Sequence, residues 1–216
     1  MQIMFYRNIG KRMFDLVCAF LALIILSPVL LLVALCVKIK LGSPLIFRQM
    51  RPGRGEKPFP LFKFRTMTSE CDAAGNLLPD SRRLRPIGEF LRRTSLDELP
   101  ELLNVIRGEM SLIGPRPLLV RYLPYFSIEE RTRFTVRPGI TGLAQVSGRN
   151  DLSWDSRLQK DIQYVGSLSL GGDLKIFFDT IFCVLRRHGY QTDPNAIMLD
   201  FDAERRLKSR AKNERC

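Results

Sequence analysis

The chain has 216 residues, enough for one domain of ordinary size, and its 45% hydrophobic content excludes a chain that stays disordered. Its 34 lysines and arginines against 22 acidic residues leave a net charge of +12, which indicates an anionic partner: nucleic acid, a phospholipid surface or a phosphorylated substrate. The five cysteines show no Cys-x-x-Cys spacing and fit a reducing, cytosol-facing location.

An apolar segment at residues 16–37 comes first in the chain. It runs for 22 residues without a charge, and as a helix it would reach about 33 Å, roughly one bilayer core. The run is longer than the core of a signal peptide, and no obvious small-residue cleavage site follows it. The sequence therefore predicts a retained membrane anchor.

Two features of this segment indicate a re-entrant course. Basic residues lie on both flanks, which favours a cytoplasmic position for both ends. Pro28 removes an amide donor and clashes with the carbonyl four residues earlier, while the Ser27 hydroxyl can bind a freed backbone group. A bent helix that enters and leaves on one face satisfies both features, and a spanning helix with a proline kink is the alternative. Asp15, at the mouth of the segment, is expected to pair with Lys11 or Arg12.

The chain after the anchor predicts a β-hairpin within residues 44–67. Two short segments rich in aromatic and β-branched residues are separated there by Pro-Gly-Arg-Gly. In the second segment Lys63 and Arg65 alternate with other residues, so they share one face of a strand. That face is either solvated or turned toward phosphate. Residues 70–83 are predicted to form a loop, and a helical pattern resumes up to Arg93.

An acid pair, Asp97 and Glu98, stands at the predicted start of the next helix. Apolar residues at helical spacing predict that helix: Leu99, Leu102, Leu103 and Ile106. Pro100 is tolerated in a first turn, and Ser95 with Glu98 matches the Ser-x-x-Glu capping box. In the simplest interpretation one acid caps the helix and the other complements its dipole.

The surroundings of the acid pair favour a chemical role over capping alone. A second acid is unnecessary for a cap, and nearby cations are expected to hold both acids ionised: Arg92, Arg93, Arg107 and Arg116. Ionised carboxylates suit a nucleophile or a metal ligand, and Mg²⁺ takes one or two of them while water and phosphate complete its shell. The Gly-Pro-Arg-Pro turn at 114–117 is predicted to be rigid and to aim a single guanidinium at a phosphate.

Three segments complete the chain. Residues 136–151 form a glycine-rich loop with Arg137 and Arg149, and this loop lacks the pattern of a P-loop. Residues 173–187 predict a helix with one broad apolar face, which fits a core helix or, in the interpretation we favour beside an anchor, a helix in the lipid interface. The charged, nearly aromatic-free residues from about 203 onward predict a mobile tail.

These motifs, in this order, resemble a known family of membrane enzymes. The basic N-terminus and the broken apolar segment are followed by KPFPLFKFRTM, LRRTSLDELPELLNVIRGEMSLIGPRPLL and RPGITGLAQVSGRN. The combination resembles the bacterial sugar transferases called monotopic phosphoglycosyl transferases, most closely their small PglC-type members, over residues 6–187. The expected fold is α+β and mainly helical: a re-entrant membrane helix-break-helix (1–40), a compact cytosolic catalytic domain with a small β-hairpin and interfacial amphipathic helices (41–188), and a C-terminal tail (189–216).

The resemblance implies a reaction at the cytoplasmic face of the bacterial inner membrane. The family transfers a sugar 1-phosphate from a UDP-sugar to polyprenyl (undecaprenyl) phosphate and releases UMP, the first membrane step of a glycoconjugate pathway. Similarity to the small members favours a UDP-linked acetamido or diacetamido sugar, while a single sequence leaves the sugar, the pathway and the oligomeric state open.

The resemblance also assigns roles to particular residues. Asp97 corresponds to the family's nucleophile, which attacks the β-phosphorus and forms a phosphosugar-enzyme intermediate, and Glu98 corresponds to its Mg²⁺ ligand. Ser27 and Pro28 match the dipeptide that breaks the re-entrant helix. Five further residues match positions around the family's site, the cations among them as contacts to phosphate or nucleotide: Lys63, Arg92, Arg116, Arg149 and Asp161.

Two alternatives remain open. A membrane-bound glycosyltransferase would transfer the sugar alone and release UDP, and it would not need an adjacent Asp-Glu pair. A membrane-tethered basic module that binds nucleic acid or anionic lipid would explain the charge and the anchor but not the acid pair. Since the sequence has no nucleic-acid motif or aromatic stacking surface, the predicted partners are a UDP-sugar, polyprenyl phosphate and membrane lipid, without nucleic acid.

Overall fold

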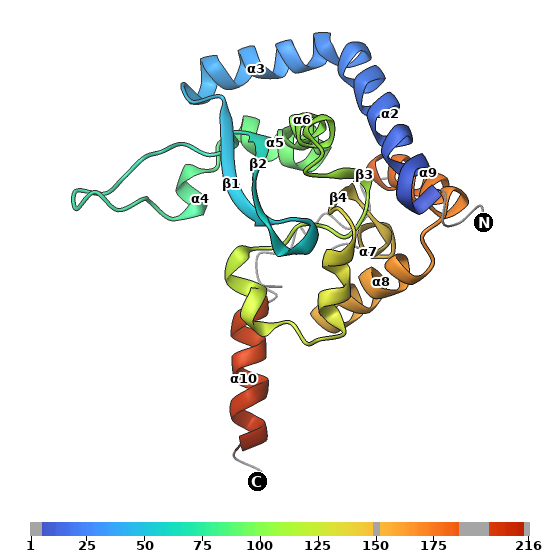
Figure 1. Ribbon diagram of the computed structural model, residues 1–216. Coiled ribbons are helices and arrows are strands. Elements are labelled where there is room, and N and C mark those ends of the chain that lie inside the picture. The colour runs from blue at the N-terminus through green and yellow to red at the C-terminus, as the bar shows by residue number, and fades with distance from the viewer. Residues whose placement is uncertain (1–5, 149–151, 186–198, 214–216) are drawn as a thin grey trace.

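The fold is mainly helical with two small sheets, as the sequence predicts. The computed structural model describes residues 6–148, 152–185 and 199–213. Helices α2 and α3 lie at one end of the molecule and α10 projects from the other, with the hairpin and the remaining helices between them (Figure 1).

The anchor consists of two helices joined at a sharp bend. α2 (Lys11–Ile25) follows a short π-helix and meets α3 (Ser27–Leu41) at 63°. Pro28 stands in the first turn of α3, where a helix has no partner for its missing N–H, and the Ser27 hydroxyl donates to the carbonyl of Ile24 at 2.8 Å. The predicted break is confirmed. Among the described residues no single helix is long and apolar enough to cross a membrane, whereas this bent pair meets both criteria together.

The predicted hairpin is confirmed. β1 (Ile46–Pro52) pairs with β2 (Pro58–Phe64) in antiparallel register, with Lys63 opposite Phe47. Phe59 and Leu61 of β2 are buried in the same cluster as Ala19 of α2, so this strand forms one wall of the core beside α2.

The rest of the chain forms short helices around a second, smaller sheet. That sheet pairs β3 (Ser111–Ile113) in parallel with β4 (Gly139–Thr141). The remaining helices before the C-terminal one are α4 (Asp80–Arg83), α5 (Pro86–Thr94), α6 (Glu101–Arg107), α7 (Leu143–Val146), α8 (Trp154–Gly166) and α9 (Leu170–Leu185), with 3₁₀ segments η3 (Leu96–Glu98), η4 (Val120–Tyr125) and η5 (Glu130–Thr135).

The predicted capping box at the start of α6 is wrong. Ser95 adopts a left-handed conformation with φ 57° and ends α5, so its side chain does not cap the turn that follows. The amide of Glu98 bonds the backbone carbonyl of Ser95 at 3.2 Å instead. Asp97 and Glu98 therefore lie in the 3₁₀ turn η3, just before α6, and their side chains are not used as caps.

Buried polar residues, here called the anchor network, fasten α2 to the body of the protein: Tyr6, Lys11, Asp15, Ser111, Tyr164 and Asp173. Lys11 pairs with Asp173 of α9 at 2.6 Å. The predicted pairing of Asp15 with a cation one turn away is wrong, because Asp15 accepts from the hydroxyl of Ser111 and the amide of Leu112, each at 3.0 Å. Burial against β3 thus supplies donors that the local sequence does not show.

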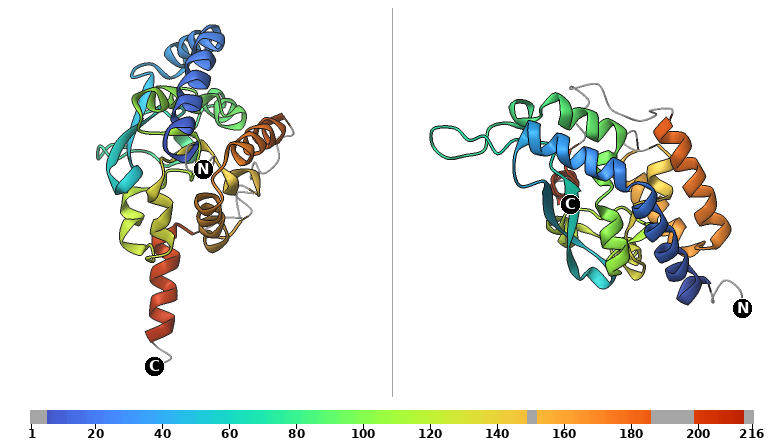
Figure 2. Two further views of the ribbon diagram at one scale, coloured as in Figure 1. Left: turned by 45° about the vertical axis from the view of Figure 1, so that its right-hand side comes forward. Right: turned by 90° about the horizontal axis from the view of Figure 1, so that it is seen from above.

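Helix α9 lies next to the first turn of α2, to which the pair between Lys11 and Asp173 joins it (Figure 2). Its outer face remains apolar and exposed: Leu174, Phe177, Phe178, Ile181 and Phe182. This arrangement fits the lipid-interface interpretation better than that of a core helix, since a core helix would bury these side chains.

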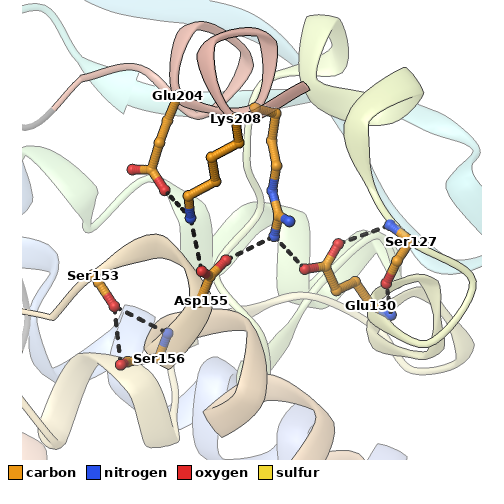
Figure 3. Close-up of polar contacts among 8 residues, drawn as sticks. Ser127, Glu130, Ser153, Asp155, Ser156, Glu204 and Lys208 are labelled. Carbon is orange, nitrogen blue, oxygen red and sulfur yellow. Dashed lines mark hydrogen bonds and ion pairs between the residues drawn. The ribbon is translucent and has the colours of Figure 1, made fainter. Parts of the chain in front are cut away.

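A docked helix, α10 (Phe201–Asn213), stands where the sequence predicts a mobile tail. Phe201 is fully buried against the rings of Tyr122, Phe126 and Trp154. Ion pairs then join α10 to η5 and α8 (Figure 3): Arg205 with Glu130 and Asp155, and Lys208 with Asp155. A buried aromatic side chain and these ion pairs together dock a segment whose composition suggests disorder. Residues 189–198 of the predicted tail lie outside the described residues.

Candidate functional site

A group of five charged residues, here called the acid cluster, surrounds the turn η3: Asp97, Glu98, Glu101, Lys63 and Arg116. Lys63 reaches it from β2 and Arg116 from the Gly-Pro-Arg-Pro turn. The two cations contact the same oxygen of Glu98, Oε1, at 2.6 and 2.5 Å. Lys63 also lies 3.3 Å from Glu101. Three carboxylates therefore share two cations.

Asp97 is the acid in this cluster without an ion pair among the described residues. Its exposed fraction is only 7%. Burial, reinforced by the charge of Glu98, raises the pKa of Asp97 to about 6, although Lys63, Arg116 and Arg92 oppose the shift. At neutral pH the group is thus a mostly ionised, poorly solvated carboxylate, a suitable state for a nucleophile.

Glu98 is in the opposite electrostatic state. Burial would raise its pKa, but the charges and hydrogen bonds of Arg116 and Lys63 outweigh burial and lower the pKa to about 2. Glu98 in turn raises the pKa of Arg116. The cations therefore outweigh burial at Glu98, whereas at Asp97 burial outweighs the cations, although this carboxyl is still mostly ionised at neutral pH.

Glu101 is a member of the cluster that the sequence analysis missed. It is 2% exposed, and burial together with the charge of Glu98 raises its pKa to about 7. Its position three residues after Glu98 on a helical turn was the available signal, because that spacing places both side chains on one face.

A tightly packed turn positions Arg116. The amide of Gly114 donates to the carbonyl of Thr141 at 2.8 Å, and the amide of Gly139 donates to the carbonyl of Pro115 at 3.0 Å. A Cβ on Gly114 would lie 2.6 Å from a backbone oxygen of the facing segment, so only glycine allows this approach. The glycine-rich loop that the sequence analysis singled out therefore fixes the Gly-Pro-Arg-Pro turn.

The structure brings some of the predicted site residues to the acid cluster and separates others from it. Arg92 binds the hydroxyl of Thr66 at 3.0 Å and lies close enough to Asp97 to lower its pKa. Asp161 pairs instead with Arg133, and it lines the same cavity as the acid pair. Arg149 lies outside the described residues.

Arg133 is a second residue that the sequence analysis missed. Its guanidinium lies 2.8 Å from Asp161 and donates to the backbone carbonyl of Arg116 at 2.7 Å. Burial raises the pKa of Asp161, and the charge of Arg133 opposes that shift. No local pattern marks Arg133, because its partners are distant in the sequence.

A single cavity of about 1600 Å³ contains both the acid pair and the residues around it. Apolar side chains of the anchor line it: Cys18 and Ala22 of α2, and Leu26 at the bend between α2 and α3. Asp97 and Glu98 line the same cavity. Its lining also includes basic and aromatic side chains: Arg51, Arg116, Tyr122, Arg133, Trp154 and Arg157.

Few side chains at this site can act as ligands of a metal ion. Within the described ranges no three His, Cys, Asp or Glu side chains are arranged to hold a metal. Mg²⁺ needs only one or two carboxylates when a substrate phosphate and water supply the rest. Asp97 and Glu98 are adjacent carboxylates on the cavity wall, so the residues present fit that ion.

Comparison with known proteins identifies the family. A model of the bacterial sugar transferase family matches residues 6–187. The chain belongs to the bacterial sugar transferase family. The matched residues include the anchor, the acid cluster and α9, whereas α10 lies beyond them.

Curated relatives carry related names. The chain is 49% identical over 181 residues to an uncharacterized sugar transferase, EpsL, of Bacillus subtilis, covering 84% of this chain and 90% of that protein. It is 40% identical over 186 residues to a UDP-glucose:undecaprenyl-phosphate glucose-1-phosphate transferase of Caulobacter vibrioides, covering 81% and 69%. It is also 41% identical over 197 residues to an undecaprenyl-phosphate galactose phosphotransferase of Salmonella typhimurium, covering 83% of this chain but only 41% of that protein.

Proposed function

We propose that this sugar transferase moves a sugar 1-phosphate from a UDP-sugar to polyprenyl phosphate and releases UMP. The observation that carries the proposal is the unequal acid pair: Glu98 is held by two cations, while the neighbouring buried Asp97 has no ion pair among the described residues and faces the cavity. The names of the Caulobacter and Salmonella relatives support the same reaction.

In the proposed first step, a carboxylate oxygen of Asp97 attacks the β-phosphorus of the UDP-sugar. A bond forms between that oxygen and phosphorus, and the bond from phosphorus to the oxygen bridging the two phosphates breaks. The bridging oxygen leaves with the α-phosphate as UMP. In the second step a phosphate oxygen of the polyprenyl phosphate attacks the same phosphorus and frees the carboxylate of Asp97.

The cations of the cluster stabilise charge during both steps. Lys63 and Arg116 stand beside Glu98, where they can withdraw charge from a diphosphate and stabilise the departing UMP. We propose that Mg²⁺, held by Glu98 with Asp97 beside it, supplies further charge stabilisation when bound.

The two kinds of side chain that line the cavity support a division between the two substrates. The apolar side chains from α2 suit a polyprenyl chain that arrives from lipid, and the basic and aromatic side chains suit a nucleotide diphosphate. A re-entrant α2–α3 pair and an interfacial α9 would hold this cavity at the cytoplasmic face of the bacterial inner membrane. Enzyme and lipid acceptor would then meet in one plane.

Nucleotide release from purified protein tests the proposal. The assay contains Mg²⁺, polyprenyl phosphate and a panel of UDP-glucose, UDP-galactose and UDP-linked acetamido and diacetamido sugars, because the relatives' names and the motif resemblance favour different donors. UMP release with one donor is expected. UDP release would indicate transfer of the sugar alone and contradict the proposal. Release of neither, with binding of anionic lipid that needs no UDP-sugar, would favour a tethered basic module.

A further inference from the structure

Arg133 is a buried arginine in the wall of the cavity. It lies in η5, and its side chain is only 3% exposed. Its guanidinium lies beside the rings of Phe126 and Phe134, at 5.5 and 5.4 Å from their centres. Since arginines are almost never fully buried unless their charge is compensated, this position requires partners for all its nitrogens.

The partners of Arg133 account for two of its three nitrogens. Nε donates to Oδ2 of Asp161 at 3.1 Å, and Nη2 contacts the same carboxylate at 2.8 Å and donates to the carbonyl of Arg116 at 2.7 Å. Nη1 is buried and has no hydrogen-bond partner within the described part of the chain.

An unpaired donor on a side chain that lines a cavity points to an acceptor that the described part of the protein does not supply. Buried polar groups in native proteins are paired in the great majority of cases, because an unpaired donor has lost its water without compensation. The fork of Arg133 is held rigid by Asp161 and two phenylalanine rings, so its free nitrogen loses little entropy when an acceptor arrives.

The charge around Arg133 indicates that the acceptor is anionic. Arg133 donates to the backbone carbonyl of Arg116, and the guanidinium of Arg116 binds Glu98 of the acid pair. Arg51 lines the same cavity, its pKa is lowered by burial and by the charge of Arg116, and its Nε is also buried without a partner in the described ranges. Phosphate oxygens are the acceptors that satisfy several guanidinium groups at once.

We infer that Arg133 is a further binding residue of the donor site, whose Nη1 donates to an oxygen of the α-phosphate of the UDP-sugar. The inference rests on the proposed function. Asp97 would attack the β-phosphorus beside Arg116, and Arg133 lines the same cavity and binds the backbone of Arg116, so it is close to where the neighbouring α-phosphate would lie. UMP, which keeps that phosphate, should therefore bind through Arg133 as well.

Calorimetric titration of the full-length, detergent-solubilised protein with UMP tests the inference. Arg133→Lys keeps the positive charge beside Asp161 but loses the fork and its free nitrogen, so we expect the Kd for UMP to rise at least tenfold. Arg131→Lys is the matched control. Arg131 lies in the same segment and also binds a carboxylate and a backbone carbonyl, those of Glu56 and Leu123, but it does not line the cavity.

Uridine separates contact with the phosphate from a structural role. A direct contact predicts that Arg133→Lys loses affinity for UMP while its affinity for uridine stays within about twofold, whereas a distorted site would lose both. Equal UMP affinity in Arg133→Lys and the wild type would overturn the inference, and so would equal losses for UMP and uridine. If wild-type protein releases UMP in the transfer assay, these outcomes leave the proposed function intact.

If Arg133→Lys does not fold, a structure of the wild-type protein with bound UMP tests the contact between Arg133 and the phosphate. We expect Nη1 of Arg133 within about 3.2 Å of a phosphate oxygen. A phosphate bound elsewhere, with Nη1 still unpaired, would overturn the inference.

Discussion

The anchor network and the acid cluster both bury charged side chains, but they differ in how those charges are compensated. In the anchor network Asp173 accepts from Tyr6 and Lys11 on Oδ2, at 2.7 and 2.6 Å, and from Tyr164 on Oδ1 at 2.9 Å. In the acid cluster Lys63 and Arg116 pair with Glu98 and Glu101, and Asp97 has no ion pair among the described residues. Asp15 of the anchor network also has no ion pair there, but it accepts hydrogen bonds from Ser111 and Leu112.

This difference separates a structural network from a reactive one. The anchor network joins the N-terminal residues and α2 to helices and strands that are far away in the sequence. Its members are not among the residues that line the cavity. The acid cluster opens onto the cavity and carries shifted pKa values in both directions. A buried charged side chain is therefore not by itself a sign of a reactive site. A buried charge that lacks a full set of partners and lies beside a cavity is a better indicator.

The largest effect is expected from Asp97→Asn in the acid cluster. An amide cannot form the acyl phosphate, so turnover should fall by at least about a thousandfold. The melting temperature should stay the same or rise, because the variant no longer buries a charge. UMP release and thermal unfolding measure the two effects, and activity close to wild type would remove Asp97 from the mechanism.

The next largest effect is expected from Asp173→Asn in the anchor network, and it should fall on stability. The change leaves the buried ammonium of Lys11 without its counter-charge, which costs about 3–5 kcal/mol of unfolding free energy. The turnover of the molecules that remain folded should be close to wild type. Asp179→Asn, which breaks an exposed pair with Lys175 on the same helix, should cost less than about 1 kcal/mol.

Equilibrium unfolding, combined with activity per folded molecule, checks this second prediction. A loss of turnover in Asp173→Asn without a loss of stability would contradict the division between the two networks.

Lys63→Met should shift the pH dependence of the reaction. The ascending limb of kcat/KM should follow ionisation of Asp97 at about pH 6 in the wild type. Lys63 lowers the pKa of Asp97, so its removal should move this limb upward by about one pH unit. Lys57→Met, at an exposed position of the hairpin, should leave the limb unchanged. A limb that stays in place or moves downward in Lys63→Met would contradict the assignment.

A smaller effect on stability than that of Asp173→Asn is expected from Glu101→Gln. The pKa of Glu101 is raised from 4.5 to about 7, so between these values the native state holds more protons than the unfolded state and wild-type stability falls as pH rises. The variant lacks this titration, and its unfolding free energy relative to wild type should increase from pH 5 to pH 8 by about 2 kcal/mol. Denaturant titrations at several pH values measure this change in unfolding free energy. Glu89→Gln, at an exposed position, is the control and should show a difference from wild type that does not depend on pH. A pH-independent difference would mean that Glu101 titrates normally.

The sequence was sufficient for features that arise from neighbouring residues. Ser27 and Pro28 predict the bend because a missing amide acts within one helical turn. Turn residues between β-type segments predict the hairpin, and an apolar stripe predicts α6. The family motifs then indicated Asp97 and Glu98 as a pair.

Long-range contacts could not be predicted in the same way. Lys11 and Asp173 are separated by 162 residues, and each has nearer oppositely charged residues in the sequence. Arg133 belongs to a charged segment in which nothing distinguishes it from Arg131 until the fold buries it. The docking of α10 depends on Phe201, one aromatic residue whose binding surface comes from distant parts of the chain.

Stoichiometric UMP release without an acceptor tests the central claim most directly. Wild-type protein is mixed with Mg²⁺ and its donor UDP-sugar in the absence of polyprenyl phosphate, and UMP and the intact protein mass are measured together. We predict a burst of one UMP per active site and a protein heavier by one sugar phosphate, with neither in Asp97→Asn. UMP formed only when the acceptor is present, with no change in protein mass, would contradict a covalent intermediate on Asp97.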